Sequence, residues 1–150
     1  MGKKPKILLA ANIFYPDIGG PAVHVRKIAE TLHERGYPVT VVTYSNVKDS
    51  DHFPFPVVRI IRSQHPLLRW SKYTAAIFRH AFNAKIIYAF NVSASGIPAF
   101  LAAKVFGKKV AIRIPGDPIW ERTAEKGLRL MPISQYYREG FHMKDRPWLY

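Results

Sequence analysis

The segment from Ile7 to Tyr44 contains the pattern that most restricts what this chain can fold into. Ile7 to Ala11 is a continuous apolar run, which is typical of a strand covered on both faces of a parallel sheet. Apolar residues then recur at helical spacing and predict a helix from Pro21 to Arg35, with Gly36 just past its end. The β-branched run from Val39 to Tyr44 predicts a second strand. The segment is therefore a βαβ unit and indicates a parallel sheet.

The alternation of strands and helices continues to residue 114. Further strands are expected over residues 57–61, 85–90 and 109–114, and helices over residues 67–83 and 94–106. The third strand is short and follows a polar, proline-containing loop, so we expect it near a sheet edge. The whole pattern predicts an α/β fold: a Rossmann-like, doubly wound three-layer sandwich with a mainly parallel sheet in the order 3-2-1-4-5.

Length and periodicity together predict the domain organisation. A chain of 150 residues with 48% apolar content can bury one core and is too short for two ordinary domains. The periodic pattern decays after Gly127. We therefore expect a Rossmann-like domain over residues 1–127 and an irregular tail over residues 128–150. That tail stops where a sixth element is expected, so it is either truncated or paired with something outside this chain.

The charge balance points to an anionic partner. Lysine and arginine number 23 against 10 acidic residues, a formal charge of +13, which favours phosphate, nucleic acid or an acidic membrane surface. The absence of cysteine excludes a disulfide framework and thiolate chemistry, and a cytoplasmic location is the default expectation. No apolar stretch of the sequence is long enough to span a bilayer, so membrane contact would be peripheral, at the inner face.

A glycine pair, Gly19 and Gly20, lies between the first strand and its helix. In open α/β sheets the ligand lies beyond the carboxyl ends of the strands, where the strand order reverses. Glycines that precede a helix N-terminus let an anion or a sugar hydroxyl approach the backbone, although a tight turn would use the same residues. The surrounding sequence matches neither the dinucleotide fingerprint nor the P-loop, and the histidines lack metal-ligand spacing. We expect no cofactor and no metal.

Two longer segments resemble a known family. "FYPDIGGPAVHVRKIAETLHERGYPVTVVT" resembles the opening of the amino-terminal domain of retaining GT-B-fold glycosyltransferases of group 1, where a "P..GG" loop and a helix lead to a "RGH.V.V.T" strand. "ASGIPAFLAAKVFGKKVAIRIPGDPIWER" is similar to that family's G-x-P-A helix, its "GKKV" lead into the fifth strand and a "GD..WE" turn. The resemblance runs from about Lys6 to Gly127. It implies transfer of a hexosyl group from a nucleotide sugar to a hydroxyl acceptor, either a sugar or a lipid-linked one.

The resemblance also implies a set of substrate-binding residues. Gly19 and Gly20 would form the loop that faces the cleft between two domains, near the distal phosphate of the donor and the acceptor. His24 would point toward the acceptor, and Asn91 and Gly116 would line neighbouring loops. Ordinary structural roles, a solvated helix residue for His24 and a loop cap for Asn91, fit the same sequence.

Asp117 is the candidate catalytic residue. A carboxylate at the carboxyl end of a strand would orient or deprotonate an acceptor hydroxyl. A turn or helix-cap aspartate would look the same in the sequence, so both interpretations stay open. Many relatives carry histidine immediately before this aspartate, where this chain has Gly116.

The donor-binding part of the family is not among these 150 residues. In relatives, a second Rossmann-like domain holds most of the nucleotide sugar. Transfer by this fold depends on stabilising the leaving phosphate, so half of the cleft supplies only part of that stabilisation. We therefore expect the acceptor-side half of an enzyme, which on its own transfers sugar poorly.

A basic face on the helix over residues 67–83 suggests a membrane contact. Arg69, Lys72 and Arg79 lie on its polar side and would attract an anionic bilayer, although a solvated face looks alike. The opposite face is predicted to be apolar, with Leu67, Leu68, Trp70, Tyr73, Ile77, Phe78, Ala81 and Phe82. The alternative function is therefore a basic, non-catalytic binding module for a membrane surface or nucleic acid. No RNA- or DNA-binding motif is present, so nucleic acid is not expected. A third possibility is a partner domain that associates through aromatic residues of its tail, such as Tyr136, Tyr137 and Trp148.

Overall fold

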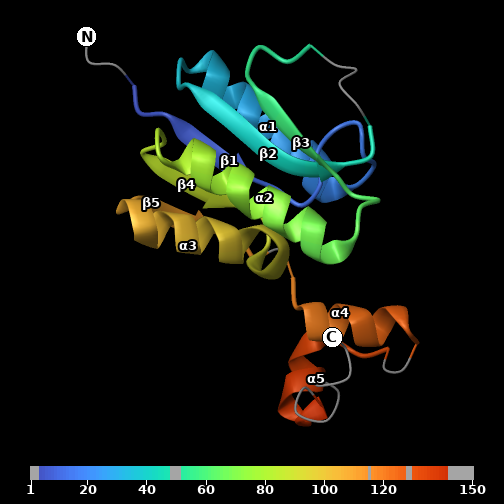
Figure 1. Ribbon diagram of the computed structural model, residues 1–150. Helices are drawn as coiled ribbons and strands as arrows, with labels where there is room; N and C mark the ends of the chain where they lie inside the picture. The colour runs from blue at the N-terminus through green and yellow to red at the C-terminus, as the bar shows by residue number, and fades with distance from the viewer. Residues whose placement is uncertain (1–3, 48–51, 115, 128–129, 142–150) are drawn as a thin grey trace. The chain divides into compact units, whose positions relative to one another are not determined.

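The computed structural model describes residues 4–47, 52–114, 116–127 and 130–141. By compactness the chain divides into two units, Met1–Arg113 and Ile114–Tyr150, which are described here one at a time. The first unit contains the sheet and its covering helices (Figure 1).

Five parallel strands form the sheet of the first unit. They are β1 (Ile7–Ala10), β2 (Val39–Ser45), β3 (Val57–Ile61), β4 (Ile86–Ala89) and β5 (Lys109–Ile112). Their order is β3-β2-β1-β4-β5, which confirms the predicted topology and the edge position of the third strand. In the register of the central strands, Ile7 lies between Val39 and Ile86. The strand order therefore reverses between β1 and β4.

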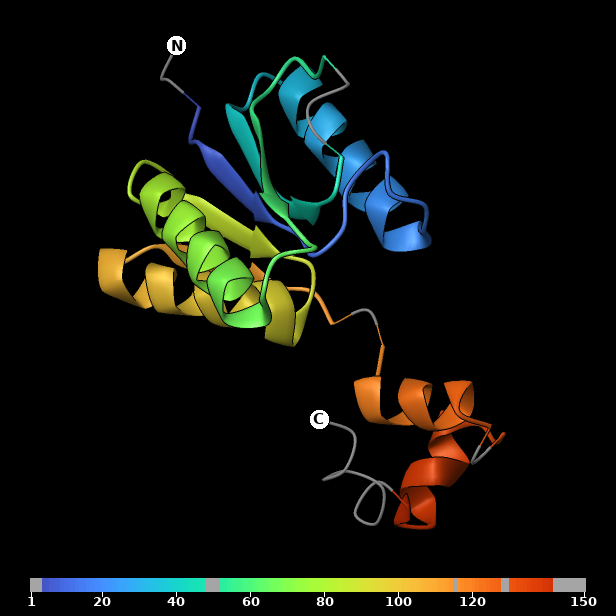
Figure 2. The same cartoon turned by 45° about the vertical axis from the view of Figure 1, so that its right-hand side comes forward.

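Helices cover both faces of this sheet. They are α1 (Gly20–Glu34), α2 (Pro66–Ala81) and α3 (Ile97–Phe106). Figures 1 and 2 show α2 and α3 side by side on one face and α1 on the other. All four residues of β1 are buried, which explains why that strand is apolar throughout rather than alternating. The first unit is thus the predicted three-layer α/β sandwich.

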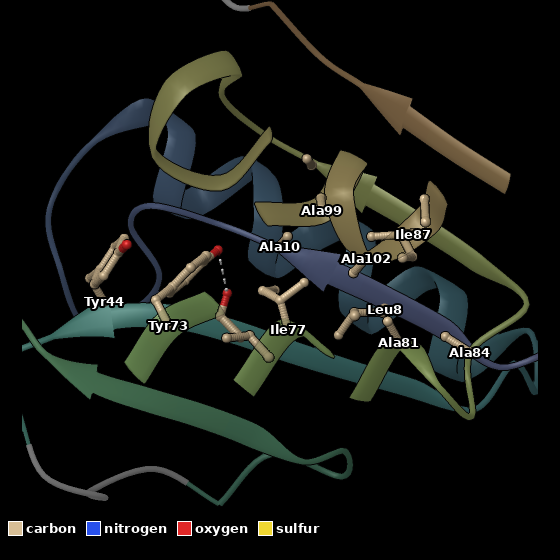
Figure 3. Close-up of a cluster of buried hydrophobic side chains, with 13 residues drawn as sticks. Leu8, Ala10, Tyr44, Tyr73, Ile77, Ala81, Ala84, Ile87, Ala99 and Ala102 are labelled. Carbon is tan, nitrogen blue, oxygen red and sulfur yellow. Dashed lines mark hydrogen bonds between the residues drawn. The ribbon is translucent and has the colours of Figure 1, made fainter. Parts of the chain in front are cut away.

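Tyr73 anchors the core between the sheet and α2. Its side chain is fully buried and stacks on Tyr44, with ring centroids 4.2 Å apart (Figure 3). The hydroxyl donates a hydrogen bond to the carbonyl oxygen of Ala11 at 2.9 Å, so the polar tip of the buried ring is satisfied. Burial raises the pKa of Tyr73 well above its ordinary value. The ring therefore stays neutral and fixes α2 to the carboxyl end of β1.

The predicted helix over residues 94–106 is two elements. A π-helical turn, η1 (Val92–Gly96), precedes α3. Gly96 permits this turn, because a Cβ atom there would lie 2.6 Å from the backbone oxygen of Asn91. Helical periodicity does not distinguish a π turn from an α turn, so the sequence predicted one continuous helix.

The predicted apolar face of α2 is buried only in part. Tyr73, Ile77 and Ala81 are buried, whereas Leu67 is 74% exposed and Leu68 and Trp70 are also exposed. The amphipathic pattern identifies which residues are apolar, but the neighbouring elements decide which of them are covered. The beginning of α2 therefore presents apolar side chains to solvent.

The second unit contains two short helices, α4 (Pro118–Glu125) and α5 (Ile133–Arg138). Tyr136 and Thr123 are fully buried within the described structure. Helix α5 lies in the stretch for which the sequence offered no clean period. The predicted division of the chain after Gly127 stays a prediction, because compactness alone does not define a domain. No helix in the described ranges has the length and apolar character that a bilayer crossing requires.

Candidate functional site

The carboxyl edge of the sheet brings the glycine loop beside the loop after β4. Ala10 pairs with Ala89 at the ends of β1 and β4, and the backbone N–H of Phe90 donates to the carbonyl oxygen of Ala10 at 3.0 Å. The imidazole of His24, on the second turn of α1, meets the Phe90 ring edge-to-face at 6.1 Å between centroids. The two predicted loops are therefore neighbours at the point where the strand order reverses.

The glycine pair leaves the beginning of α1 open. Gly19 has φ 151° and ψ 153°, a backbone conformation that is essentially restricted to glycine. Gly20 is exposed, and no atom lies within 4 Å of the position that a Cβ would occupy there. No side chain caps α1, and its first turn contains no acidic residue. Pro21 has no N–H and the N–H of Val23 donates to the carbonyl oxygen of Gly19, so the N–H groups of Gly20 and Ala22 are the ones that the beginning of the helix can offer to an anion or a hydroxyl oxygen.

Arg62, directly after β3, holds the glycine loop in place. Its Nη2 donates to the carboxylate of Asp17 at 2.8 Å and lies 3.3 Å from the carbonyl oxygens of Asn12 and Tyr44. One guanidinium therefore ties the loop to the ends of β1 and β2. Sequence reasoning missed Arg62, and its only signal was a basic residue directly after the third strand.

Aromatic contacts also hold the glycine loop in place. Tyr15 meets Phe53 edge-to-face with centroids 6.2 Å apart, and Phe53 in turn contacts Phe14 at 5.2 Å. The guanidinium of Arg26 lies 4.5 Å from the centroid of the Tyr15 ring, within range of a cation–π interaction. The peptide bond between Tyr15 and Pro16 is cis. These contacts define the loop without covering Gly20.

His24 is half-buried on α1 and carries a perturbed imidazole. Burial lowers the pKa of His24, and the positive charges of Arg113 and Lys27 lower it further. A hollow of about 340 Å³ opens along this flank of α1, lined by His24, Lys27, Ile28, Thr31 and Leu32. The imidazole is therefore neutral at pH 7 and able both to donate and to accept a hydrogen bond.

Asn91 caps the π-helical turn. Its side-chain oxygen accepts hydrogen bonds from the backbone N–H of Ser93 at 2.9 Å and of Ala94 at 3.1 Å. The Ser93 hydroxyl donates to the same oxygen at 3.1 Å. The oxygen is thus occupied by local structure, and the amide nitrogen is the group left for a substrate. The predicted substrate contact of Asn91 stays a prediction.

Asp117 lies in the second unit and caps α4. One carboxylate oxygen accepts the backbone N–H of Trp120 at 2.8 Å, and the other accepts the hydroxyl of Tyr137. That hydrogen bond, with some burial and the negative charge of Asp117, raises the pKa of Tyr137 to about 12. Both carboxylate oxygens therefore take part in the structure of the second unit, while the predicted catalytic role stays untested.

Gly116 lies against α4, the helix that follows it. The space that a Cβ would occupy there is taken by the carboxylate of Glu121, one turn into α4. Trp120 donates its indole N–H to the carbonyl oxygen of Met131 at 2.9 Å, which links α4 to the segment before α5. A substrate-binding role for Gly116 stays a prediction.

A second hollow, here called the α2 groove, opens at the same edge of the sheet as the glycine loop. Its volume is about 520 Å³, and it lies between the beginning of α2, the end of β2 and η1. It is lined by Tyr44, Arg62, Pro66, Leu67, Arg69, Trp70, Ser93 and Ala94. Most of the lining is aliphatic or aromatic, and none of these described residues is acidic.

The three predicted basic residues of α2 differ in their surroundings. Arg69 folds back over the Tyr44 ring, with its Cζ atom 5.7 Å from the ring centroid, and its Nη1 donates to the carbonyl oxygen of Arg62 at 2.9 Å. Lys72 and Arg79 are exposed farther along the helix. Arg69 thus belongs to the α2 groove, and the role of all three at a membrane stays a prediction.

Within the part of the chain that the structure describes, no group of three acidic or histidine side chains gathers in a way that would hold a metal ion. The available binding groups at the sheet edge are instead backbone N–H groups, a neutral imidazole, an amide and guanidinium groups. These groups suit phosphate and hydroxyl oxygens.

Comparison with solved structures identifies the fold. The chain is similar to the C-terminal domain of a hydrogenase from Pyrococcus furiosus, with 16% identity and a TM-score of 0.50, over 76% of this chain and 95% of that one. A second crystal structure of that hydrogenase domain gives 16% identity and a TM-score of 0.49, over 75% and 94% of the two chains. At this identity the likeness concerns the α/β fold alone.

Comparison of sequences identifies the family. No curated protein sequence matches this chain. The sequence model of the glycosyl transferase 4-like domain, by contrast, matches residues 19–143. That match begins at the glycine loop, contains the switch point between β1 and β4 and extends beyond α5. It covers most of the chain, so this protein belongs to the family of glycosyl transferase 4-like domains.

Proposed function

We propose that this glycosyltransferase-family module is the acceptor-side half of a nucleotide-sugar-dependent retaining glycosyltransferase, which transfers a hexosyl group to a hydroxyl acceptor. The observation that carries the proposal is the open glycine pair at the uncapped beginning of α1, at the edge where the strand order reverses. In such a fold this position faces the ligand.

The physical argument concerns the charge of the donor. The nucleotide diphosphate develops negative charge as the bond between the sugar and its phosphate oxygen breaks. N–H groups at the beginning of a helix stabilise that charge. Gly20 has no side chain to keep a phosphate oxygen away from those groups. The ion pair between Asp17 and Arg62 holds the loop in this conformation before any ligand arrives, so little ordering cost remains for binding.

Neighbouring residues would bind the acceptor. His24, neutral at pH 7, would accept or donate a hydrogen bond to an acceptor hydroxyl, and the amide nitrogen of Asn91 would donate one. We keep Asp117 as the candidate for orienting the acceptor hydroxyl. Its carboxylate already accepts hydrogen bonds from the Trp120 N–H and the Tyr137 hydroxyl, so an acceptor hydroxyl would share these oxygens with them or compete for them.

Residues beyond these 150 would supply most of the donor contacts. The chain alone should therefore bind nucleotide sugars weakly and transfer little sugar, because stabilisation of the transition state is divided between two halves of a cleft. A cytoplasmic location, with peripheral contact at the inner face of a membrane, is part of the proposal. Lys72 and Arg79, exposed on α2, are the candidates for that contact.

Amide hydrogen exchange tests the proposal directly. The full chain is measured with and without millimolar nucleotide diphosphate sugars, and we expect slower exchange at Ile18 to Val25. Gly20→Trp should abolish this protection by filling the open space, whereas Gly20→Ala should keep the fold and most of the protection, because a Cβ there contacts nothing. Unchanged exchange at the loop with every nucleotide sugar would refute the proposal.

The alternative is a basic, non-catalytic module, favoured by the formal charge of +13. It predicts binding to anionic vesicles with no response of the glycine loop to any nucleotide sugar. Loss of that binding in the double variant Lys72→Gln with Arg79→Gln would assign it to the exposed part of α2.

A further inference from the structure

We propose that the α2 groove binds the apolar chain of a phosphate-bearing lipid acceptor, with Arg69 facing the phosphate. This inference rests on the proposed function, because it names the class of acceptor that the module would take. The occupant is a single hydrocarbon chain that carries an anionic head, rather than a bilayer surface.

The shape and lining of the α2 groove favour a hydrocarbon chain. Its volume of about 520 Å³ lies within the range of about 300–1,000 Å³ that is usual for ligand pockets. Pro66, Leu67 and Trp70 form one wall, from the first turns of α2, and Ala94 of η1 contributes to the other. Figures 1 and 2 both show the beginnings of α2 and of the η1–α3 segment side by side at one end of the sheet. A chain in this hollow would contact carbon on both sides.

Apolar side chains continue from the α2 groove onto the surface. Leu67 is 74% exposed and Trp70 is 43% exposed, although both belong to the predicted apolar face of the helix. In the segment whose Ser93 and Ala94 line the groove, Val92 of η1 and Ile97 of α3 are also about half exposed. A chain that leaves the groove over these residues would cover apolar surface that is otherwise exposed to water, which is favourable in proportion to the area covered.

Charge selects an anionic head group. Of the two arginines that line the α2 groove, Arg62 is paired with Asp17, and its charge is compensated. Arg69 has no acidic partner among the described residues, and its hydrogen bond to the carbonyl oxygen of Arg62 uses one N–H of a guanidinium that carries several. A guanidinium binds phosphate in a planar, two-pronged arrangement. Arg69 therefore supplies a positive charge that no acidic residue lining the groove balances.

One residue connects the α2 groove to the glycine loop. Arg62 lines the groove and also holds Asp17, two residues before Gly19. A lipid whose chain lies in the groove would thus have its head group at the same edge of the sheet as the open beginning of α1. This arrangement matches an acceptor that presents a hydroxyl or phosphate to a sugar donor bound at the glycine loop.

Titration with decyl phosphate in monomeric solution tests the inference on the full chain. Binding is measured by calorimetry and by the backbone and indole N–H signals in NMR spectra, with Trp70→Phe used to assign the Trp70 indole. We expect shifts at residues 67–70 and 93–94, and inorganic phosphate should bind at least about 100-fold more weakly because it fills none of the apolar hollow.

Substitutions separate the two parts of the site. Arg69→Gln should weaken decyl phosphate binding about 10- to 100-fold, the usual effect of losing a charge-assisted hydrogen bond. Leu67→Ser should weaken it by about 3- to 10-fold. Both changes are at sites with substantial solvent access, so folding is expected to survive. The matched controls Arg35→Gln, at the exposed end of α1, and Val105→Ser, at an exposed site of α3, should leave binding unchanged.

Three results would overturn the inference: equal affinity for inorganic and decyl phosphate, unchanged binding in Arg69→Gln, or binding seen only with anionic vesicles and abolished by Lys72→Gln with Arg79→Gln. Parallel exchange measurements with nucleotide sugars separate its failure from that of the proposed function. If decyl phosphate binds in the α2 groove while no nucleotide sugar protects the glycine loop, the groove stands as a lipid phosphate site and the proposed function fails. If the loop is protected and the groove is silent, only this inference fails.

Discussion

The glycine loop of the first unit, residues 12–20, and the turn over residues 116–121 of the second unit both contain predicted site residues but differ in how they use their polar groups. In the glycine loop, distant side chains supply the order: Arg62 binds Asp17, and Phe53 packs against Tyr15. In the turn, order is supplied by the candidate residue itself, because the Asp117 carboxylate accepts hydrogen bonds from Trp120 and Tyr137.

The two regions therefore differ in which residues hold them in place. In the glycine loop, side chains outside the glycine pair do so, and the space over Gly20 stays open among the described residues. The turn uses the very carboxylate that chemistry would need. The proposed ligand would therefore meet less competition at the glycine loop than at Asp117, where the Tyr137 hydroxyl already donates to the carboxylate.

Among these variants, Gly19→Ala should cause the largest loss in the free energy of unfolding. Its conformation at φ 151° and ψ 153° is nearly closed to other residues, so we expect a loss of about 1–3 kcal/mol in the free energy of unfolding. Urea denaturation followed by circular dichroism measures it. Gly20→Ala, the adjacent control, should change stability by less than about 0.5 kcal/mol. Equal effects at both positions would show that the loop does not depend on the unusual backbone of Gly19.

Asp17→Asn should have the next largest effect, because it loosens the glycine loop. The Asp17 side chain is 18% exposed and that of Arg62 is 36% exposed, so solvent recovers part of the lost interaction and we expect a cost of about 1–2 kcal/mol. Amide exchange over residues 12–18 should become faster. Glu30→Gln, which breaks an exposed pair with Arg26 on α1, should cost only about 0.3–0.5 kcal/mol. If the loop exchanges no faster in Asp17→Asn, Arg62 does not hold it.

Asp117→Ala tests whether the turn is structural. Loss of a helix cap typically costs about 1 kcal/mol, and we expect faster exchange in α4. Asp117→Asn keeps one oxygen for the cap and removes the charge, so it should restore most of the stability of α4. A variant without Asp117 that exchanges like the parent would indicate that the carboxylate is held for function rather than for the helix.

The smallest effect is expected on the stability of the folded chain at alkaline pH. The pKa of Tyr137 is about 12 in the folded chain against an ordinary value of 10, so the hydroxyl keeps its proton longer when folded. Its contribution to stability is fully present below pH 10 and is lost as pH rises to about 12. The difference in stability between the parent and Tyr137→Phe should shrink over that interval, and Asp117→Asn should return the pKa of Tyr137 toward 10. A pH-independent difference would exclude the hydrogen bond to Asp117 as its cause.

Sequence reasoning identified the sheet order and most element bounds of the first unit, because apolar runs mark its strands and helical spacing marks its helices. It also identified the glycine loop, since glycine reports a backbone requirement directly. It missed Arg62, which acts on Asp17 across 45 positions of sequence. It also grouped Arg69 with Lys72 and Arg79, whereas the contact of Arg69 with Tyr44 depends on how α2 lies on the sheet.

The sequence by itself determined the alternation of strands and helices, the glycine pair before the first helix and the excess of positive charge, because each of these can be read without knowing the tertiary structure. Only the tertiary structure decided which charges are compensated, which apolar side chains of α2 stay uncovered and which carboxylate is already hydrogen-bonded. Those outcomes depend on distances between residues far apart in the chain, and such distances exist only after the sheet has brought its loops to one edge.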